Sequence, residues 1–196
     1  TVGSVLGTDV THIPTPPLPE GDESVRIGTD RVFQFSSALR GLISDLAQDL
    51  ALGRSVCLVG EKGSGKSCLV SELARVLGYA NTTTTVHLYK DMGARDLLVR
   101  RTTNERGDSE WELSPLLKAA LSGGLCVLDG VHRLRAETLS ALGPLLQDCL
   151  LALPQGGQLM RADRFDAVCA RTGQTPEELV SRGILRAHPA FRLVAL

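Results

Sequence analysis

Hydrophobic positions along this chain follow two different repeats. Between residues 37 and 50 they recur every three or four positions, which predicts an amphipathic helix that ends before Gly53. After residue 66 the same spacing predicts a helix of about three turns, closed by Gly78. Its apolar positions are Leu69, Leu73, Val76 and Leu77.

Shorter apolar or β-branched runs predict strands near residues 55–59, 82–89, 125–129 and 191–196. Residues 125–128 are all apolar, which is typical of a strand buried on both faces of a parallel sheet. Since these runs alternate with helical patterns, the sequence predicts an α/β fold with a mainly parallel sheet flanked by helices.

The pattern also predicts two hairpins, at about 102–113 and about 150–160. Trp111 lies on the second arm of the first hairpin and is expected to pack that hairpin on the body. Further helices are expected at 91–101, from Ser114-Pro115 to Leu121, at 135–150 with a kink or restart at Gly143-Pro144, at 165–172, and from Thr175 to near Gly183.

Composition indicates an ordinary globular chain of 196 residues, with 43% hydrophobic and 22% charged residues. The net charge of −1 gives no reason to expect nucleic-acid binding, and no apolar run reaches the about 18 residues that span a bilayer. Residues 1–24 are rich in proline and predict an extended linker, and residues 25–196 form the expected core. The chain begins at Thr1, so we expect it to be part of a longer protein.

Five cysteines without a C-x-x-C spacing indicate a reducing compartment rather than a disulfide scaffold. Cys57 and Cys126 lie in the apolar runs and are expected to be small core residues.

The run at 55–59 leads into G-x-x-x-x-G-K-S, and a helical pattern follows it. This order of strand, glycine-rich loop and helix is that of a phosphate-binding P-loop, whose backbone N–H groups surround an anion. The predicted nucleotide-binding residues are Gly60, Glu61, Lys62, Gly63, Ser64, Gly65, Lys66 and Ser67.

Within this loop Lys66 is expected to reach the β- and γ-phosphates of a nucleoside triphosphate, and the Ser67 hydroxyl is expected to bind Mg²⁺. Asp129 follows the buried run at 125–128 and is expected at the carboxyl edge of the sheet, where ligands bind in open α/β folds. It is the second predicted Mg²⁺ ligand and, with Lys66, a predicted catalytic residue.

Gly130 occupies the next position, where many ATPases of this layout carry a glutamate that polarises the attacking water. A positioned base contributes about 3–5 kcal/mol to lowering the barrier, so binding is expected to survive and hydrolysis to be weak. His132 is a weaker candidate for the base, because a single histidine after a turn is usually a surface residue.

From Gly60 onward, the order of features resembles AAA+ ATPases of the MoxR, midasin and dynein clade, whose members carry one hairpin in their second helix and another before sensor 1. The matching segments are Asp96-Leu97, 111–113, Ser114-Pro115-Leu116, 125–129, Arg133, the helix through Gln147, and Phe191-Arg192-Leu193. Five longer strings resemble a module of a large mitochondrial member of the clade: 88–92, 95–98, 127–130, 161–165 and 188–192.

The resemblance implies the large subdomain of an AAA+ P-loop NTPase that uses ATP and Mg²⁺. Its neighbours would be other modules or subunits of a ring, its client an unidentified protein, and its location mitochondrial. The chain is expected to end near sensor 1, before the arginine finger and the lid subdomain. Two alternatives remain open: a structural or regulatory module that binds ATP without hydrolysing it, and a small P-loop kinase or GTPase. The second lacks an N-K-x-D motif and leaves the two hairpins unexplained.

Overall fold

A four-stranded parallel sheet forms the centre of the computed structural model, which describes residues 37–103, 107, 109–153 and 156–196. The strand order is β1 (Val56–Cys57), β9 (Arg192–Ala195), β5 (Leu125–Asp129) and β2 (Thr83–His87). Residues 1–36 lie outside the described part, and they include the expected linker at 1–24. The predicted parallel α/β sheet is confirmed.

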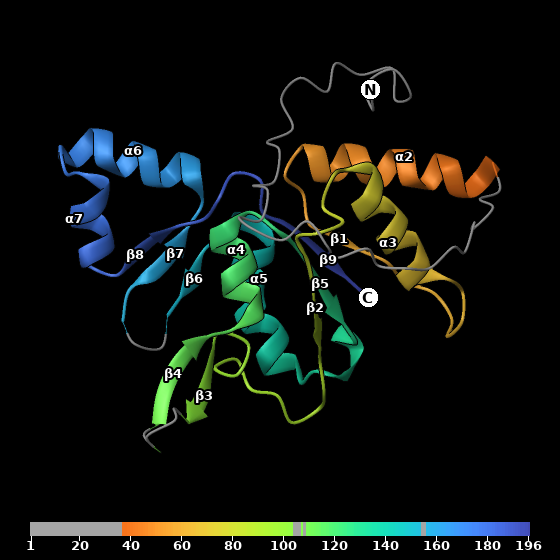
Figure 1. The fold of residues 1–196 in the computed structure, drawn as a ribbon, viewed down its shortest axis with the longest axis horizontal. Helices are drawn as coiled ribbons and strands as arrows, with labels where there is room; N and C mark the ends of the chain where they lie inside the picture. Colours follow the sequence, from red (N-terminus) through yellow and green to blue (C-terminus); the bar gives the residue numbers. More distant parts are fainter. Residues whose placement is uncertain (1–36, 104–106, 108, 154–155) are drawn as a thin grey trace.

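Helices cover both faces of this sheet (Figure 1). One face packs on α2 (Ser37–Ala51) and α3 (Lys66–Val76), and the other on α4 (Pro115–Ser122) and α5 (Ala136–Asp148). Along β5 the side chains alternate between the faces: Leu125 and Val127 join the α2–α3 cluster, and Cys126 and Leu128 join the α4–α5 cluster. The fully apolar run of β5 therefore supplies two cores at once.

Two smaller sheets project from the body. The hairpin of β3 (Val99–Thr103) and β4 (Ser109–Leu113) extends from one end, and β6 (Leu151–Ala152), β7 (Gln158–Met160) and β8 (Ile184–Arg186) form the other sheet (Figure 1). Two helices, α6 (Ala162–Thr172) and α7 (Pro176–Ser181), connect β7 to β8. Both hairpins were predicted, whereas β8 and its parallel pairing with β7 were not. The side chain of Trp111 is outside the described part.

The helix expected at 91–101 is wrong. Successive turns run from Tyr89 to Leu98, and one of them is closed by the Asp96 carboxylate, which accepts a hydrogen bond of 2.9 Å from the Gly93 N–H. Three consecutive residues, 97–99, are then buried, a pattern that one face of a helix cannot produce. The chain enters β3 at Val99, three residues earlier than expected.

Helix α5 does not restart at Gly143-Pro144 as expected but continues to Asp148. Leu142 and Leu145 are buried on either side of this pair, so packing offsets the hydrogen bond that proline cannot donate. The prediction for Cys57 was also wrong: its side chain is exposed on the short edge strand β1, whereas Cys126 is buried in β5.

No helix in the described residues is both long enough and apolar enough to cross a membrane.

Candidate nucleotide-binding site

The predicted P-loop connects β1 to α3 at the carboxyl edge of the sheet. Gly65 precedes the first residue of α3 with φ of 84°, a left-handed conformation that favours glycine. No side chain caps this helix and no acidic residue lies in its first turn. The free N–H groups and the positive end of the helix dipole are therefore available to an anion.

Lys66 folds back over this loop, and its amine donates hydrogen bonds to the carbonyl oxygens of Gly60, at 2.9 Å, and Glu61, at 2.8 Å. The Ser64 hydroxyl lies 3.5 Å from the same nitrogen. The amine is thus held over the curve of the loop by neutral oxygen atoms only. A phosphate placed there would offer Lys66 charged oxygens, and charge-assisted hydrogen bonds are the stronger kind.

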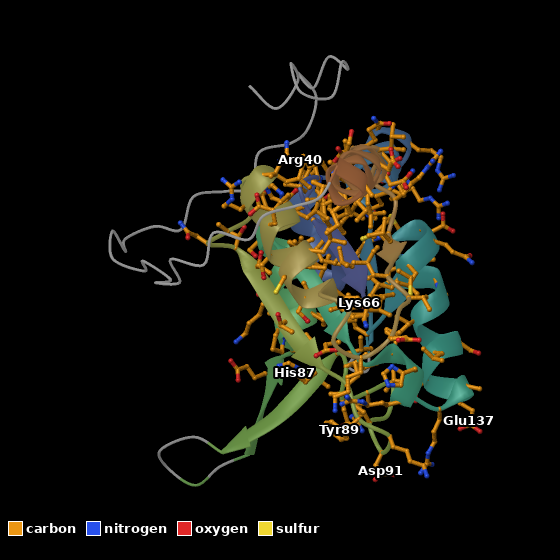
Figure 2. The ribbon with its side chains drawn as sticks, turned by 90° about the vertical axis from the view of Figure 1, so that its right-hand side faces the viewer. Arg40, Lys66, His87, Tyr89, Asp91 and Glu137 are labelled. Atoms are coloured by element: carbon orange, nitrogen blue, oxygen red, sulfur yellow. The ribbon has the colours of Figure 1, made fainter. Side chains whose placement is uncertain are left out.

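The other predicted loop residues, Glu61, Lys62, Gly63, Ser64 and Ser67, are exposed. Ser67 follows Lys66 in the first turn of α3, so its hydroxyl belongs to the same helix end. Figure 2 shows Lys66 near the middle of the molecule, with His87 and Tyr89 below it.

Asp129 is the last residue of β5 and lies at the same sheet edge as the P-loop. Strand β9 separates β5 from β1, so the two strands are about 10 Å apart. The Asp129 side chain is 39% exposed, so the carboxylate is half in solvent at the end of an otherwise buried strand. Lys66, Ser67 and Asp129 are therefore brought to one edge, as the sequence predicted.

His87 is a component of this edge that the sequence reasoning missed. Its Nδ1 lies 3.1 Å from the Asp129 Oδ2, and the two residues are directly paired in the register of β2 and β5. A carboxylate oxygen accepts hydrogen bonds, so this contact is a hydrogen bond in the tautomer that carries the ring proton on Nδ1. The sequence carried only a partial signal, because both residues lie near the carboxyl ends of predicted strands but the order of these strands in the sheet was not predicted.

Gly130 turns the chain sharply after Asp129. Its φ is 92°, and its N–H donates to the Leu196 carbonyl at 2.9 Å. A Cβ at this position would lie 3.2 Å from the Leu88 carbonyl oxygen. The missing glutamate is therefore accompanied by a backbone conformation that disfavours a side chain.

His132, which the sequence offered as a candidate base, lies in the 3-10 turn η1 (Val131–Arg133). Its side chain is exposed. This placement agrees with the surface interpretation of His132.

The chain is similar to known proteins over the segment that contains this edge. Residues 55–196 match the family model described as AAA domain (dynein-related subfamily), which is most of the chain. The chain belongs to the dynein-related AAA family. The P-loop and Asp129 both lie within the matched range, and the small kinase or GTPase alternative is not favoured by this membership.

Relatives of this AAA domain come from animals, amoebae and bacteria. It is 41% identical over 155 residues to the von Willebrand factor A domain-containing protein 8 of Mus musculus, a match of 79% of the chain but 8% of that protein. It is 29% identical to the midasin of Dictyostelium discoideum, over 65% of the chain and 2% of midasin. A denitrification regulatory protein NirQ of Pseudomonas aeruginosa is 33% identical, over 72% of the chain and 44% of NirQ. The chain thus spans less than half the length of each.

The crystal structure of a protein from Cytophaga hutchinsonii assigned as an ATPase shares the fold. It matches with a TM-score of 0.50 and 18% identity, over 80% of this chain and 38% of that one. The chain therefore has the AAA+ P-loop NTPase fold and belongs to a family of ATPases.

Proposed function

We propose that this AAA domain binds ATP with Mg²⁺ at the edge formed by the P-loop and Asp129. The observation that carries the proposal is the position of Lys66, whose amine lies over the curve of the loop at the uncapped start of α3. In the proposed complex the loop residues 60–67 surround the phosphates, and Lys66 contacts the β- and γ-phosphates.

The side chains present fit Mg²⁺ held jointly with phosphate. Mg²⁺ in nucleotide sites uses one or two protein oxygens, phosphate oxygens and water, and the Ser67 hydroxyl and Asp129 carboxylate would supply the protein oxygens. When bound, the ion would neutralise negative charge on the phosphates.

Turnover at this site is proposed to be weak. A general base placed on the water contributes typically 10²–10⁴ in rate, and Gly130 offers none at the position where the family's ATPases carry glutamate. His87 contacts the Asp129 carboxylate and in this proposal helps to orient the metal ligand. The absence of a base at Gly130 also supports the alternative function, a structural or regulatory module that binds ATP without turnover.

At the level of the parent protein, we propose an ATPase that remodels a protein client, with this domain as one nucleotide-binding module beside other modules or subunits of a ring. The similarity to midasin and to the von Willebrand factor A domain-containing protein 8 supports this proposal. A mitochondrial location is proposed from the family resemblance alone. No nucleic-acid partner is proposed.

Thermal unfolding with Mg·ATP tests the binding site. At about 100 times its dissociation constant, ATP should add about 2.7 kcal/mol to the unfolding free energy of the wild type, and nothing to that of Lys66→Ala. Lys118→Ala is the matched control, because this exposed lysine on α4 pairs with Glu112 and its loss should leave the ATP effect intact. An equal shift in Lys66→Ala would contradict the proposed site.

Steady-state ATP hydrolysis separates the two functions. Slow turnover that disappears in Lys66→Ala supports the weak ATPase, and binding without any turnover supports the structural or regulatory module.

A further inference from the structure

A cavity of about 420 Å³ lies at the opposite edge of the sheet, beside the amino ends of β1 and β9. We call it the amino-edge cavity. Its walls come from residues 51–55, from Arg161 and Ala162 at the start of α6, and from residues 187–189 and 191–193. The end of α5 contributes Leu145, Leu146, Gln147 and Cys149. Figure 1 shows the end of α2 and the start of α6 facing one another on this side. From Arg192 to Leu196 the chain rises about 13 Å, so the P-loop edge is remote.

Arg192 is the distinctive residue of this cavity, because it is 7% exposed and has no carboxylate partner among the described residues. Its Nε donates to the Leu50 carbonyl, and its Nη1 donates to the carbonyls of Pro189, at 2.7 Å, and Phe191, at 2.8 Å. Its Nη2 has no acceptor in the described part of the chain.

Neutral carbonyls only partly compensate a buried guanidinium. Leu50 lies in the last turn of α2, whose dipole contributes roughly half a negative charge. Burial also lowers the pKa of Arg192, which is the direction expected of a cation taken out of water without an anionic partner. One positive charge with two unused N–H groups therefore faces a cavity large enough for a small molecule.

The surrounding charges favour an anion. Arg54 and Arg161 also line the cavity, each with an exposed carboxylate partner, and no aspartate or glutamate is among the lining residues. Helix α6 also begins there, but Asp163 in its first turn accepts from the Arg164 N–H at 2.8 Å and offsets the positive end of the helix, so Arg192 is the main positive charge at the cavity. Leu145, Phe191 and Leu193 supply an apolar wall.

From these contacts we propose that the amino-edge cavity binds a small organic anion, a carboxylate or phosphate on an apolar body, with Arg192 Nη2 as its anchor. The carboxylate or phosphate oxygens accept from Nη2, and the apolar body lies against the Leu145, Phe191 and Leu193 wall. The site is separate from the proposed nucleotide site.

Thermal unfolding of the full chain at constant ionic strength tests this with benzoate and phenyl phosphate as probes. Benzamide is the matched neutral analogue of benzoate, and inorganic phosphate lacks the apolar body. We expect saturable stabilisation by one or both anionic probes, a much weaker effect of inorganic phosphate, and none with benzamide. The stronger of benzoate and phenyl phosphate identifies the preferred oxyanion.

Two variants place the probe in the cavity. Arg192→Gln should weaken probe binding by about ten-fold or more, the loss expected for a charge-assisted hydrogen bond. If this variant fails to fold, Ala51→Phe, which fills the cavity from its rim, should abolish binding, and Lys66→Ala should leave it unchanged. The proposal is overturned if no anionic probe stabilises the chain, if benzamide acts equally, if the effect survives in Ala51→Phe, or if Lys66→Ala removes it.

Discussion

Gly130 affects the proposed site in two ways, through the side chain that it lacks and through its backbone conformation. Its position lacks a general base, and its φ of 92° with the Leu88 carbonyl oxygen nearby makes any Cβ unfavourable. Restoring a glutamate there by substitution would therefore add a carboxylate and strain the backbone that positions Asp129.

We expect Gly130→Glu and Gly130→Ala to lower the free energy of unfolding by about 1–3 kcal/mol, the usual cost of a left-handed conformation at a residue other than glycine. Gly130→Asn should cost less, since asparagine tolerates this conformation. Urea unfolding measures all three. Gly143→Ala is the control: it lies in α5 with open space around its Cβ, so the change should stabilise by roughly 0.5–1 kcal/mol. Unchanged stability with faster turnover in Gly130→Glu would refute the backbone argument.

His188 is expected to make stability depend on pH. Burial lowers its pKa, Arg186 lowers it further, and the unprotonated Nδ1 accepts the Ala190 N–H at 3.1 Å. A base with a lowered pKa in the folded state binds its proton more readily when unfolded, so stability is complete above about pH 6.5. It should then fall as the pH drops from there toward the lowered folded-state value.

The comparison of His188→Asn with wild type over this pH range measures the effect. Asparagine can also accept an N–H two residues later, so the variant should fold and lose this part of the pH dependence. His132→Asn, at an exposed position, should retain it. An identical pH profile for wild type and His188→Asn would exclude His188 as the source.

Among the helices and strands, capping residues in the sequence predicted correctly where the clearly capped helices begin. Thr175 and Glu178 form the capping box at the start of α7, and Ser114 caps α4 as its sequence suggested. In the segment at 91–101 the expected helix was wrong: a turn closed by Asp96 and the buried residues 97–99 that lead into β3 take its place.

Ser114→Ala is expected to lower the unfolding free energy by about 1–2 kcal/mol, at the upper part of the range for N-caps. The Ser114 side chain is buried, accepts from the Leu117 N–H, and donates to the Leu97 carbonyl at 2.6 Å, so its loss leaves buried partners unsatisfied. Denaturant midpoints measure this cost. The control, Ser140→Ala, removes an exposed hydroxyl bonded within α5 and should change stability by less than about 0.5 kcal/mol. Equal effects of the two changes would contradict the assignment.

At the scale of the molecule, one sheet couples the two hydrophobic clusters, because β5 contributes alternate side chains to each. Loss of packing on either face should therefore destabilise the same cooperative unit.

Leu73→Ala in α3 and Leu117→Ala in α4 are each expected to cost about 2–5 kcal/mol, since both side chains are fully buried on opposite faces. Circular dichroism and calorimetry should report a single transition in both variants. Leu42→Ala, at a side chain that is 40% exposed, should cost far less. Two separate transitions would show that the faces unfold independently.

Local patterns along the chain were enough to predict the order of most helices and strands, the parallel sheet, the P-loop and the position of Asp129 after a buried strand. These features follow from local chemistry: hydrophobic period, glycine and proline positions, and helix caps. The sequence thus predicted both segments of the candidate site, the P-loop and Asp129, and their place at the carboxyl edge of the sheet.

Contacts between residues far apart in the sequence became evident only in the folded chain. The pairing of His87 with Asp129 depends on β2 and β5 being neighbours in register, and the burial of Arg192 beside the end of α2 depends on β9 lying next to β1. Strand order and register are set by packing across the whole chain rather than by neighbouring residues. Gly130 belongs to both levels, since its identity was visible in the sequence and its left-handed backbone only in the fold.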